Sequence, residues 1–300
     1  METTLSTNTK YFRFILLSAL VVLHICASGA SVDTIFVKNN ALKESLPTAV
    51  VLPDSYADSN REYPVLYLLH GGSGSFRDWL TKTPDRNLLH DLSDRYQIII
   101  VTPEGSSLGY YFDSPLNEKS QYESFIAVDV VAEIDATFRT VGERKGRAIA
   151  GLSMGGHGAF FISARHPDVF CVAGSMSGVM NLNTETWKVP KEFADMRKKT
   201  FAELLGAPAE GIISYPDYSA VGLTENMKTN NVRLIFDCGV DDFLIETNRM
   251  LHQKLLDNGT AHDYTERPGG HTWEYWGNAL PYQVLFITNV FRENGVLIQD

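Results

Sequence analysis

The hexapeptide Gly151-Leu152-Ser153-Met154-Gly155-Gly156 follows an apolar run that predicts a strand, residues 147–150, and precedes a segment that predicts a helix, residues 157–165. A Gly-x-Ser-x-Gly sequence between a strand and a helix is typical of a nucleophile elbow, a turn so tight that side chains in place of its glycines would collide. The turn would expose the Ser153 hydroxyl and place the Met154 N–H at a helix start, where it can donate to an oxyanion. Taken alone, the motif is also compatible with a glycine-rich turn without chemistry.

The composition is that of a globular protein. The chain has 300 residues, of which 44% are hydrophobic, and a formal net charge of −10. No repeat, low-complexity tract or linker divides it, so we expect a single domain over residues 31–300. No cluster of lysine and arginine stands out, which argues against nucleic acid or an anionic membrane surface as a partner.

The first 30 residues have the layout of a secretory signal peptide. Lys10 and Arg13 precede an apolar run, residues 14–25, and small residues follow it. The run has about a dozen residues, whereas a bilayer span needs roughly 20. We therefore expect cleavage near residue 30 and a secreted or periplasmic protein without stable membrane insertion. Lipid attachment at Cys26 is a less favoured alternative, because an isoleucine precedes that cysteine.

Only Cys171 and Cys238 would remain after cleavage, and both fall in apolar runs that predict core strands. Two cysteines so far apart form neither a disulfide framework nor a zinc site. We expect buried free thiols, with a single disulfide as the alternative. The sequence predicts no metal and no other cofactor.

Most of the remaining sequence alternates predicted strands with predicted helices. Two β-branched runs, residues 33–38 and 48–52, predict an antiparallel pair at the edge of the domain. The further predicted strands are residues 64–70, 96–102, 170–175, 232–238 and 262–267, and the predicted helices are residues 76–80, 87–92, 121–138, 243–258 and 273–293. This order predicts an α/β fold, a mostly parallel twisted sheet covered by helices on both faces. Residues 179–231 break the alternation, and we expect them to form a cap-like insertion over the site.

Two segments supply aromatic side chains that are candidates for lining a pocket. In the loop 104–117, the group Tyr110-Tyr111-Phe112 either lines a pocket or covers the core. The insertion contributes further aromatic residues, at Trp187, Tyr215 and Tyr218. The carboxylates of the predicted helix 121–138, by contrast, are expected to form a solvated face, namely Glu123, Asp129, Glu133 and Asp135.

A serine hydroxyl is a poor nucleophile at neutral pH, so it needs a general base, and the base needs an orienting carboxylate. His271 follows the predicted strand 262–267 in a loop whose glycines would let the chain return to Ser153. Asp241 and Asp242 follow the strand before it, and either can receive an imidazole N–H while the other caps a helix.

A glycine-rich loop after the strand 64–70 is the expected source of a second oxyanion donor. Glycines let a main-chain N–H approach the developing charge, and Gly72 is our candidate beside Met154. The other two histidines near these motifs fit no catalytic position. We expect His70 to fix the glycine loop through hydrogen bonds and His157 to point away from the elbow.

Four segments together resemble the esterase D family of α/β-hydrolases: residues 70–74, 151–156, 238–244 and 269–273. That family includes S-formylglutathione hydrolases, tributyrin-type carboxylesterases, feruloyl and acetyl xylan esterases, and mycolyltransferases. The resemblance spans roughly residues 32–295 and implies an α/β-hydrolase fold with the catalytic triad Ser153, Asp242 and His271. It also implies that Gly72 and Met154 are the oxyanion donors. It favours Asp242 over Asp241, because the family's acid stands third after the glycine that ends the strand.

The resemblance is specific for the triad and weak for the substrate. S-formylglutathione hydrolases work inside cells, whereas this chain has a predicted signal peptide. We therefore expect an exported serine carboxylesterase that works through an acyl-enzyme intermediate. Its expected substrates are short-chain or aromatic acyl esters, either small molecules or esters linked to a polysaccharide such as that of plants. The alternatives are an acyltransferase of the mycolyltransferase type, a thioesterase like S-formylglutathione hydrolase and, least favoured, a binding module without activity.

Overall fold

The computed structural model describes residues 30–297, so the predicted signal peptide lies outside the described residues apart from Ala30. An eight-stranded sheet in the order β1-β2-β4-β3-β5-β6-β7-β8 forms its centre. The edge strands β1 (Ser31–Asn39) and β2 (Glu44–Leu52) are antiparallel to each other, and β2 is antiparallel to β4 (Ile99–Pro103). The other strands pair in parallel, so the mostly parallel sheet with an antiparallel edge is confirmed.

The elements agree closely with the predicted ones. The remaining strands are β3 (Val65–Leu69), β5 (Arg147–Leu152), β6 (Val172–Met176), β7 (Arg233–Gly239) and β8 (His262–Arg267). The α-helices are α1 (Asp78–Thr81), α2 (Leu88–Tyr96), α3 (Val131–Thr137), α4 (Met154–Arg165), α5 (Lys191–Leu205), α6 (Thr224–Thr229), α7 (Ile245–Asp257) and α8 (Trp273–Glu293). Short 3₁₀ turns lie at Asp54–Tyr56, Arg144–Gly146, Thr184–Thr186 and Ala220–Gly222.

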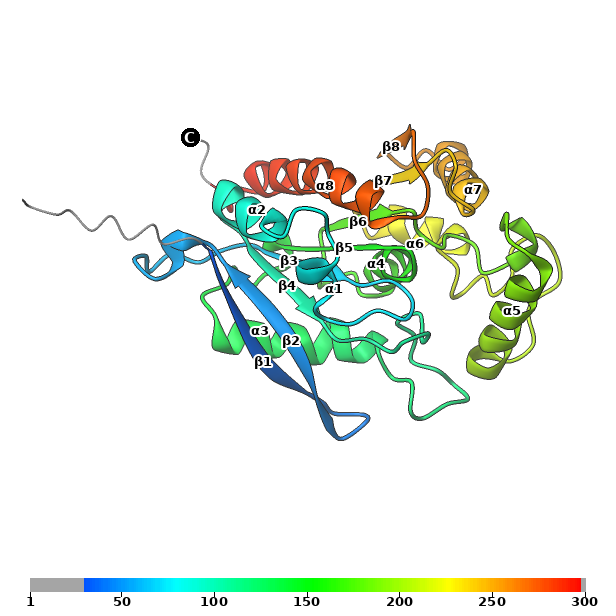
Figure 1. Cartoon of the computed structure of the whole chain (residues 1–300), viewed down its shortest axis with the longest axis horizontal. Helices are drawn as coiled ribbons and strands as arrows, with labels where there is room; N and C mark the ends of the chain where they lie inside the picture. Colours follow the sequence, from blue (N-terminus) through cyan, green and yellow to red (C-terminus); the bar gives the residue numbers. More distant parts are fainter. Residues whose placement is uncertain (1–29, 298–300) are drawn as a thin grey trace, which may run out of the picture.

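Helices cover both faces of the sheet, as the apolar strands require. Alternate residues of a strand point to opposite faces. Accordingly Tyr67 of β3 packs into the core under α3 and α4, while its neighbours Leu66 and Leu68 pack into the core under α2 and α8. Figure 1 shows α8 and α2 along one face of the sheet and α3 along the other. No helix among residues 30–297 combines the length and the apolar character needed to cross a bilayer.

The predicted helix 121–138 differs from expectation in two ways. A π-helical segment, Phe125–Val130, precedes α3. Glu123 is buried, with 5% of its surface exposed, and it accepts hydrogen bonds from Arg165 Nε at 2.7 Å and His166 Nε2 at 3.0 Å. The prediction of a solvated carboxylate was therefore wrong for Glu123, because the end of α4 supplies two basic partners there.

The insertion has two parts with different positions. Its first helix, α5, stands beyond the end of the sheet in Figure 1. Its second helix, α6, packs against α4 and α7 as part of the body of the fold. The N–H of Val221 donates to the carbonyl of Met180 at 3.0 Å, which ties the end of the insertion to its beginning. The residues of the insertion that border the cavity at Ser153 come from its first part and from α5, namely Val179, Trp187, Phe193 and Arg197.

His157 lies inside the core rather than at the site. Its Nε2 donates to the Tyr218 carbonyl at 2.7 Å, and its ring stacks on Phe161. Burial lowers the pKa of His157 to about 4, so the folded protein holds this imidazole neutral, whereas the unfolded chain protonates it near its ordinary value.

His157 is therefore expected to weaken the fold in acid. Between the folded and unfolded pKa values the unfolded state binds more protons, so stability falls as the pH drops below about 6.5 toward 4. From pH 7 to pH 5 this residue should remove roughly 2 kcal/mol from the free energy of unfolding. Urea unfolding at the two pH values measures the loss. His157→Gln should lack this part of it, and an equal loss in both proteins would contradict the assignment.

Candidate active site

Ser153 stands at the junction of β5 and α4 in a strained backbone conformation, with φ 54° and ψ −117°. Steric crowding explains why glycines flank Ser153. A Cβ at Gly151 would lie 2.5 Å from the Gly155 carbonyl oxygen, and a Cβ at Gly155 would lie 2.5 Å from the His70 carbonyl oxygen. The strand, the turn and the helix thus approach too closely for any side chain, and the strain holds the serine at the tip of the turn.

Gly155→Ala should disturb this turn, because backbone atoms on both sides would have to move. We expect a loss of about 2–3 kcal/mol in the free energy of unfolding. If the serine shifts by about 1 Å, the turnover of the ester substrates expected from the sequence should fall by about 100-fold. Thermal denaturation and initial rates measure the two effects. Gly142→Ala is the matched control, since a Cβ there meets its nearest neighbour at 4.0 Å. Equal behaviour of the two variants would contradict the steric account.

Three predicted side chains meet in one hydrogen-bonded line. Nε2 of His271 lies 2.9 Å from Oγ of Ser153, and Nδ1 of His271 lies 2.8 Å from Oδ2 of Asp242. The other oxygen of Asp242 accepts the Leu244 N–H at 2.9 Å, so this buried carboxylate is fixed at both oxygens. With Nδ1–H donated to Asp242, Nε2 presents its lone pair to the serine hydroxyl, which is the arrangement that a general base needs.

Only one of the two adjacent aspartates contacts the histidine. Asp242 is 1% exposed and bonded to His271, whereas the exposed Asp241 contributes its N–H to the Gly269 carbonyl at 3.0 Å. The loops after β7 and β8 touch backbone to backbone, because a Cβ at Gly239 would lie 2.2 Å from that same carbonyl oxygen. This close approach brings Asp242 and His271 together.

Aromatic rings hold the imidazole from two sides. The ring centroid of Phe243 lies 4.4 Å from that of His271, and the ring of Trp276 meets it edge-on at 4.8 Å. Neither residue was singled out from the sequence for this role. The only available signal was position, since Phe243 follows Asp242 directly and Trp276 lies in the first turn of the helix after His271.

The two predicted oxyanion donors border the same cavity as the serine. Met154 begins α4, so its N–H points out of the helix N-terminus, and Gly72 lies in the loop after β3. Within residues 30–297, no hydrogen bond uses the N–H of either residue. His70 helps to hold this loop, as expected, through contact of its Nδ1 with the Gly71 carbonyl at 2.8 Å. The donor role of Gly72 and Met154 stays a prediction.

Two hollows meet at Ser153. One is a cavity of about 220 Å³, lined by Gly72, Tyr110, Ser153, Met154, Val179, Trp187, Phe193, Arg197, Phe243 and His271. The other is a cleft of about 140 Å³, lined by Gly71, Gly72, Asp78, Lys82, Leu152, Ser153, His271, Trp273 and Trp276. We call them the large and the small cavity. They share the serine, the histidine and Gly72, as expected for the two halves of an ester on either side of its carbonyl.

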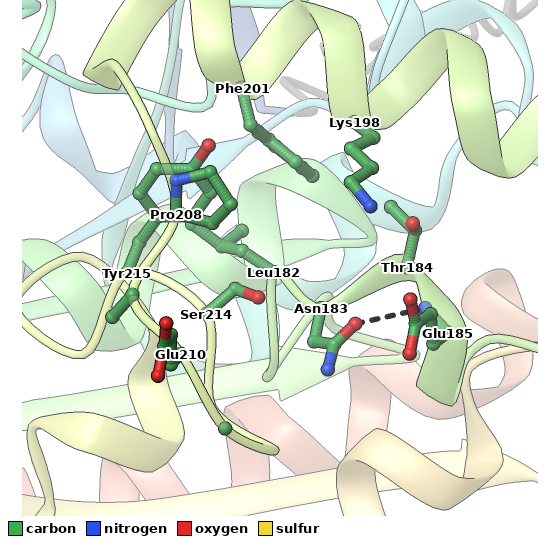
Figure 2. Close-up of a pocket in the computed structure, with 12 residues that line it drawn as sticks. Leu182, Asn183, Thr184, Glu185, Lys198, Phe201, Pro208, Glu210, Ser214 and Tyr215 are labelled. Atoms are coloured by element: carbon green, nitrogen blue, oxygen red, sulfur yellow. Dashed lines mark hydrogen bonds between the residues drawn. The ribbon is translucent and has the colours of Figure 1, made fainter.

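The expected aromatic lining is confirmed in part. Tyr110 and Trp187 line the large cavity, but Tyr111 and Phe112 are buried in the core and do not. Tyr215 and Tyr218 do not line it either. Figure 2 shows where Tyr215 goes: it borders a separate cavity of about 290 Å³, beneath Lys198 and Phe201 of α5. That cavity shares no lining residue with the two hollows at Ser153.

In the described part of the chain, no group of three or more His, Cys, Asp or Glu side chains is arranged so that it could hold a metal ion. Cys171 and Cys238, the two cysteines among residues 30–297, are buried free thiols. Burial raises the pKa of the Cys171 thiol to about 11, and it also raises the pKa of Cys238. Protonated thiols at these positions are poor nucleophiles.

Comparison with known proteins finds esterases among the relatives of this chain. The family model "Esterase", described as "Putative esterase", matches residues 39–287. Esterase Rv1288 of Mycobacterium tuberculosis is 32% identical, over 75% of this chain and 52% of its own length. An acetyl esterase of Caldicellulosiruptor saccharolyticus is 27% identical, over 84% of this chain and 93% of its own. The solved structure of a ferulic acid esterase has 31% identity and a TM-score of 0.71, covering 88% of this chain and 99% of that one. The chain spans about half the length of the first of these relatives.

Proposed function

The chain belongs to this family of esterases and has the α/β-hydrolase fold, and on that premise we propose that it is an exported serine carboxylesterase with Ser153, His271 and Asp242 as its catalytic triad. Membership of the family supports the assignment as a carboxylic ester hydrolase. The observation that carries the rest is the hydrogen-bonded line from Asp242 through His271 to Ser153, at the point where two cavities meet.

The proposed reaction has two halves. Oγ of Ser153 attacks the ester carbonyl carbon while Nε2 of His271 takes its proton, and the oxyanion accepts hydrogen bonds from Gly72 and Met154. The C–O bond to the alcohol then breaks, and the alcohol leaves with the proton from His271. Water next attacks the acyl-serine, with His271 again accepting and returning a proton, so the acid is released and Ser153 is restored. Asp242 keeps the imidazole in the required tautomer throughout.

We assign the acyl group to the large cavity and the alcohol to the small one. The large cavity is walled by aromatic rings, among them Trp187 and Phe243, and suits an apolar or aromatic acyl group. The small cavity combines Asp78 and Lys82 with the half-buried indole of Trp273, a mixture that suits a polar alcohol such as a sugar. Two relatives are named as an acetyl esterase and a ferulic acid esterase, which supports short or aromatic acyl groups. A carbohydrate alcohol, such as a plant polysaccharide, is proposed from the polar lining of the small cavity.

A panel of acetyl, butyryl and feruloyl oxygen esters tests this proposal. The expected result is release of free acid from oxygen esters, in the absence of added metal. Activity confined to thioesters such as S-formylglutathione would overturn it. Release of acyl-sugar instead of free acid, in the presence of a sugar acceptor, would replace it with the transferase. Export is tested separately, by secretion of a chain whose N-terminus lies near residue 31.

A further inference from the structure

Arg197 on α5 is the only lining residue of the large cavity that carries a permanent charge. Its Nη1 is buried and has no hydrogen-bond partner in the described part of the chain. Two lysines on the same helix have acidic partners, since Lys191 pairs with Asp195 and Lys199 pairs with Glu203, each one turn further along. The helix thus pairs two of its outer charges within itself, whereas Arg197, which borders the cavity, has a buried nitrogen without a partner in the described part of the chain.

The surroundings of this guanidinium are aromatic rather than acidic. Its Cζ lies over the ring of Phe193, 4.9 Å from the centroid, and Phe193 also lines the cavity. Tyr110 lines the same cavity and is held by an edge-on contact with Phe201 at 4.7 Å. Burial raises the pKa of Tyr110 to about 12 although the Arg197 charge opposes the shift, so this phenol stays neutral and offers no counter-charge.

A half-buried guanidinium with a free N–H costs stability unless something pairs with it. An acyl group that is only hydrocarbon would fill the aromatic cavity and deepen this cost, because it would exclude water without supplying an acceptor. An acyl group with an oxygen at its far end would remove the cost and gain a charge-assisted hydrogen bond. The cavity is therefore complementary to an apolar body with an oxygen acceptor at its end.

We propose that Arg197 is a specificity-determining residue that selects substrates whose acyl group ends in an oxygen acceptor, either a phenolic oxygen or a carboxylate. Nη1 donates to that oxygen, while the aromatic walls hold the apolar part of the group. Arg197 touches the non-reacting end of the substrate, so it acts on selectivity rather than on the bond-breaking step. The inference rests on the proposed function, since it takes the large cavity as the acyl site.

The inference is tested by the ratio of the kcat/KM values of two esters that differ only in the oxygen at the end of the acyl group. One pair is methyl 4-hydroxycinnamate and methyl cinnamate, and the other is the mono-4-nitrophenyl ester of glutaric acid and 4-nitrophenyl valerate. For the wild type, kcat/KM should favour the oxygenated member of at least one pair. Arg197→Met should lower that preference by about 10- to 100-fold, and Arg197→Lys should restore part of it. The pair that responds identifies the acceptor as phenol or carboxylate.

Lys198→Met is the matched control, because it removes the same charge from the next position of α5. Lys198 borders the separate cavity of Figure 2, so its loss should leave both ratios unchanged. Equal ratios in the wild type and Arg197→Met for both pairs would overturn the inference. Failure of the proposed function looks different: the wild type would hydrolyse none of the four esters, and a fluorophosphonate would not label Ser153.

Discussion

Ser153→Ala is expected to lower the turnover of 4-nitrophenyl acetate or butyrate by about 10⁶-fold, to the small rate that binding and the oxyanion donors sustain alone. Only the hydroxyl group is lost, and His271 then has no serine proton to accept. Initial rates at saturating substrate measure the effect, with protein purified from a host that contributes no esterase background.

Folding should be unaffected by this change, so the melting temperature of Ser153→Ala should stay within a few degrees of that of the wild type. Ser45→Ala, on the exposed part of β2, is a control that alters a serine far from the site and should keep full activity. Turnover by Ser153→Ala at the wild-type rate would show that another group attacks the ester.

Asp242→Asn is expected to lower turnover by about 10⁴-fold. The amide of asparagine can donate to Nδ1 of His271, which would leave the proton on Nε2. In that tautomer the imidazole donates to the Ser153 hydroxyl instead of accepting its proton, although the geometry hardly changes. The pH dependence of kcat, together with kcat itself, measures the loss of the base.

The adjacent aspartate supplies a matched control with the same change of charge. Asp241 is exposed and its side chain does not contact His271, so Asp241→Asn should retain near wild-type turnover. The opposite result, with Asp241→Asn inactive and Asp242→Asn active, would reject the assignment of the acid.

Much of the fold is readable from the sequence, because its signals are local. Val65–Leu69 is apolar throughout and buried on both faces, as a central parallel strand requires. The glycines around Ser153 have a steric cause that acts within a few residues. His271 and the pair Asp241 and Asp242 follow strands that end at the same edge of the sheet, so their positions predicted that one aspartate meets the histidine. The choice of Asp242 came from the family resemblance.

The features that escaped prediction depend on contacts between distant segments. Glu123 looked like a surface carboxylate because its partners, Arg165 and His166, lie at the end of another helix. For Tyr111 and Phe112 the sequence left a pocket and the core as alternatives, and the structure places both in the core. Arg197 sits in an ordinary polar helix, and only the placement of α5 over the large cavity distinguishes it from the lysines around it.

We propose that His271, oriented by Asp242, makes Ser153 the nucleophile. Treatment of the folded protein with a fluorophosphonate, followed by mass spectrometry of its peptides, tests this most directly. We predict a single adduct per chain, on the peptide that contains Ser153, and slow or no labelling of His271→Ala. A protein that stays unlabelled, or that carries the adduct on a different residue, would contradict the account.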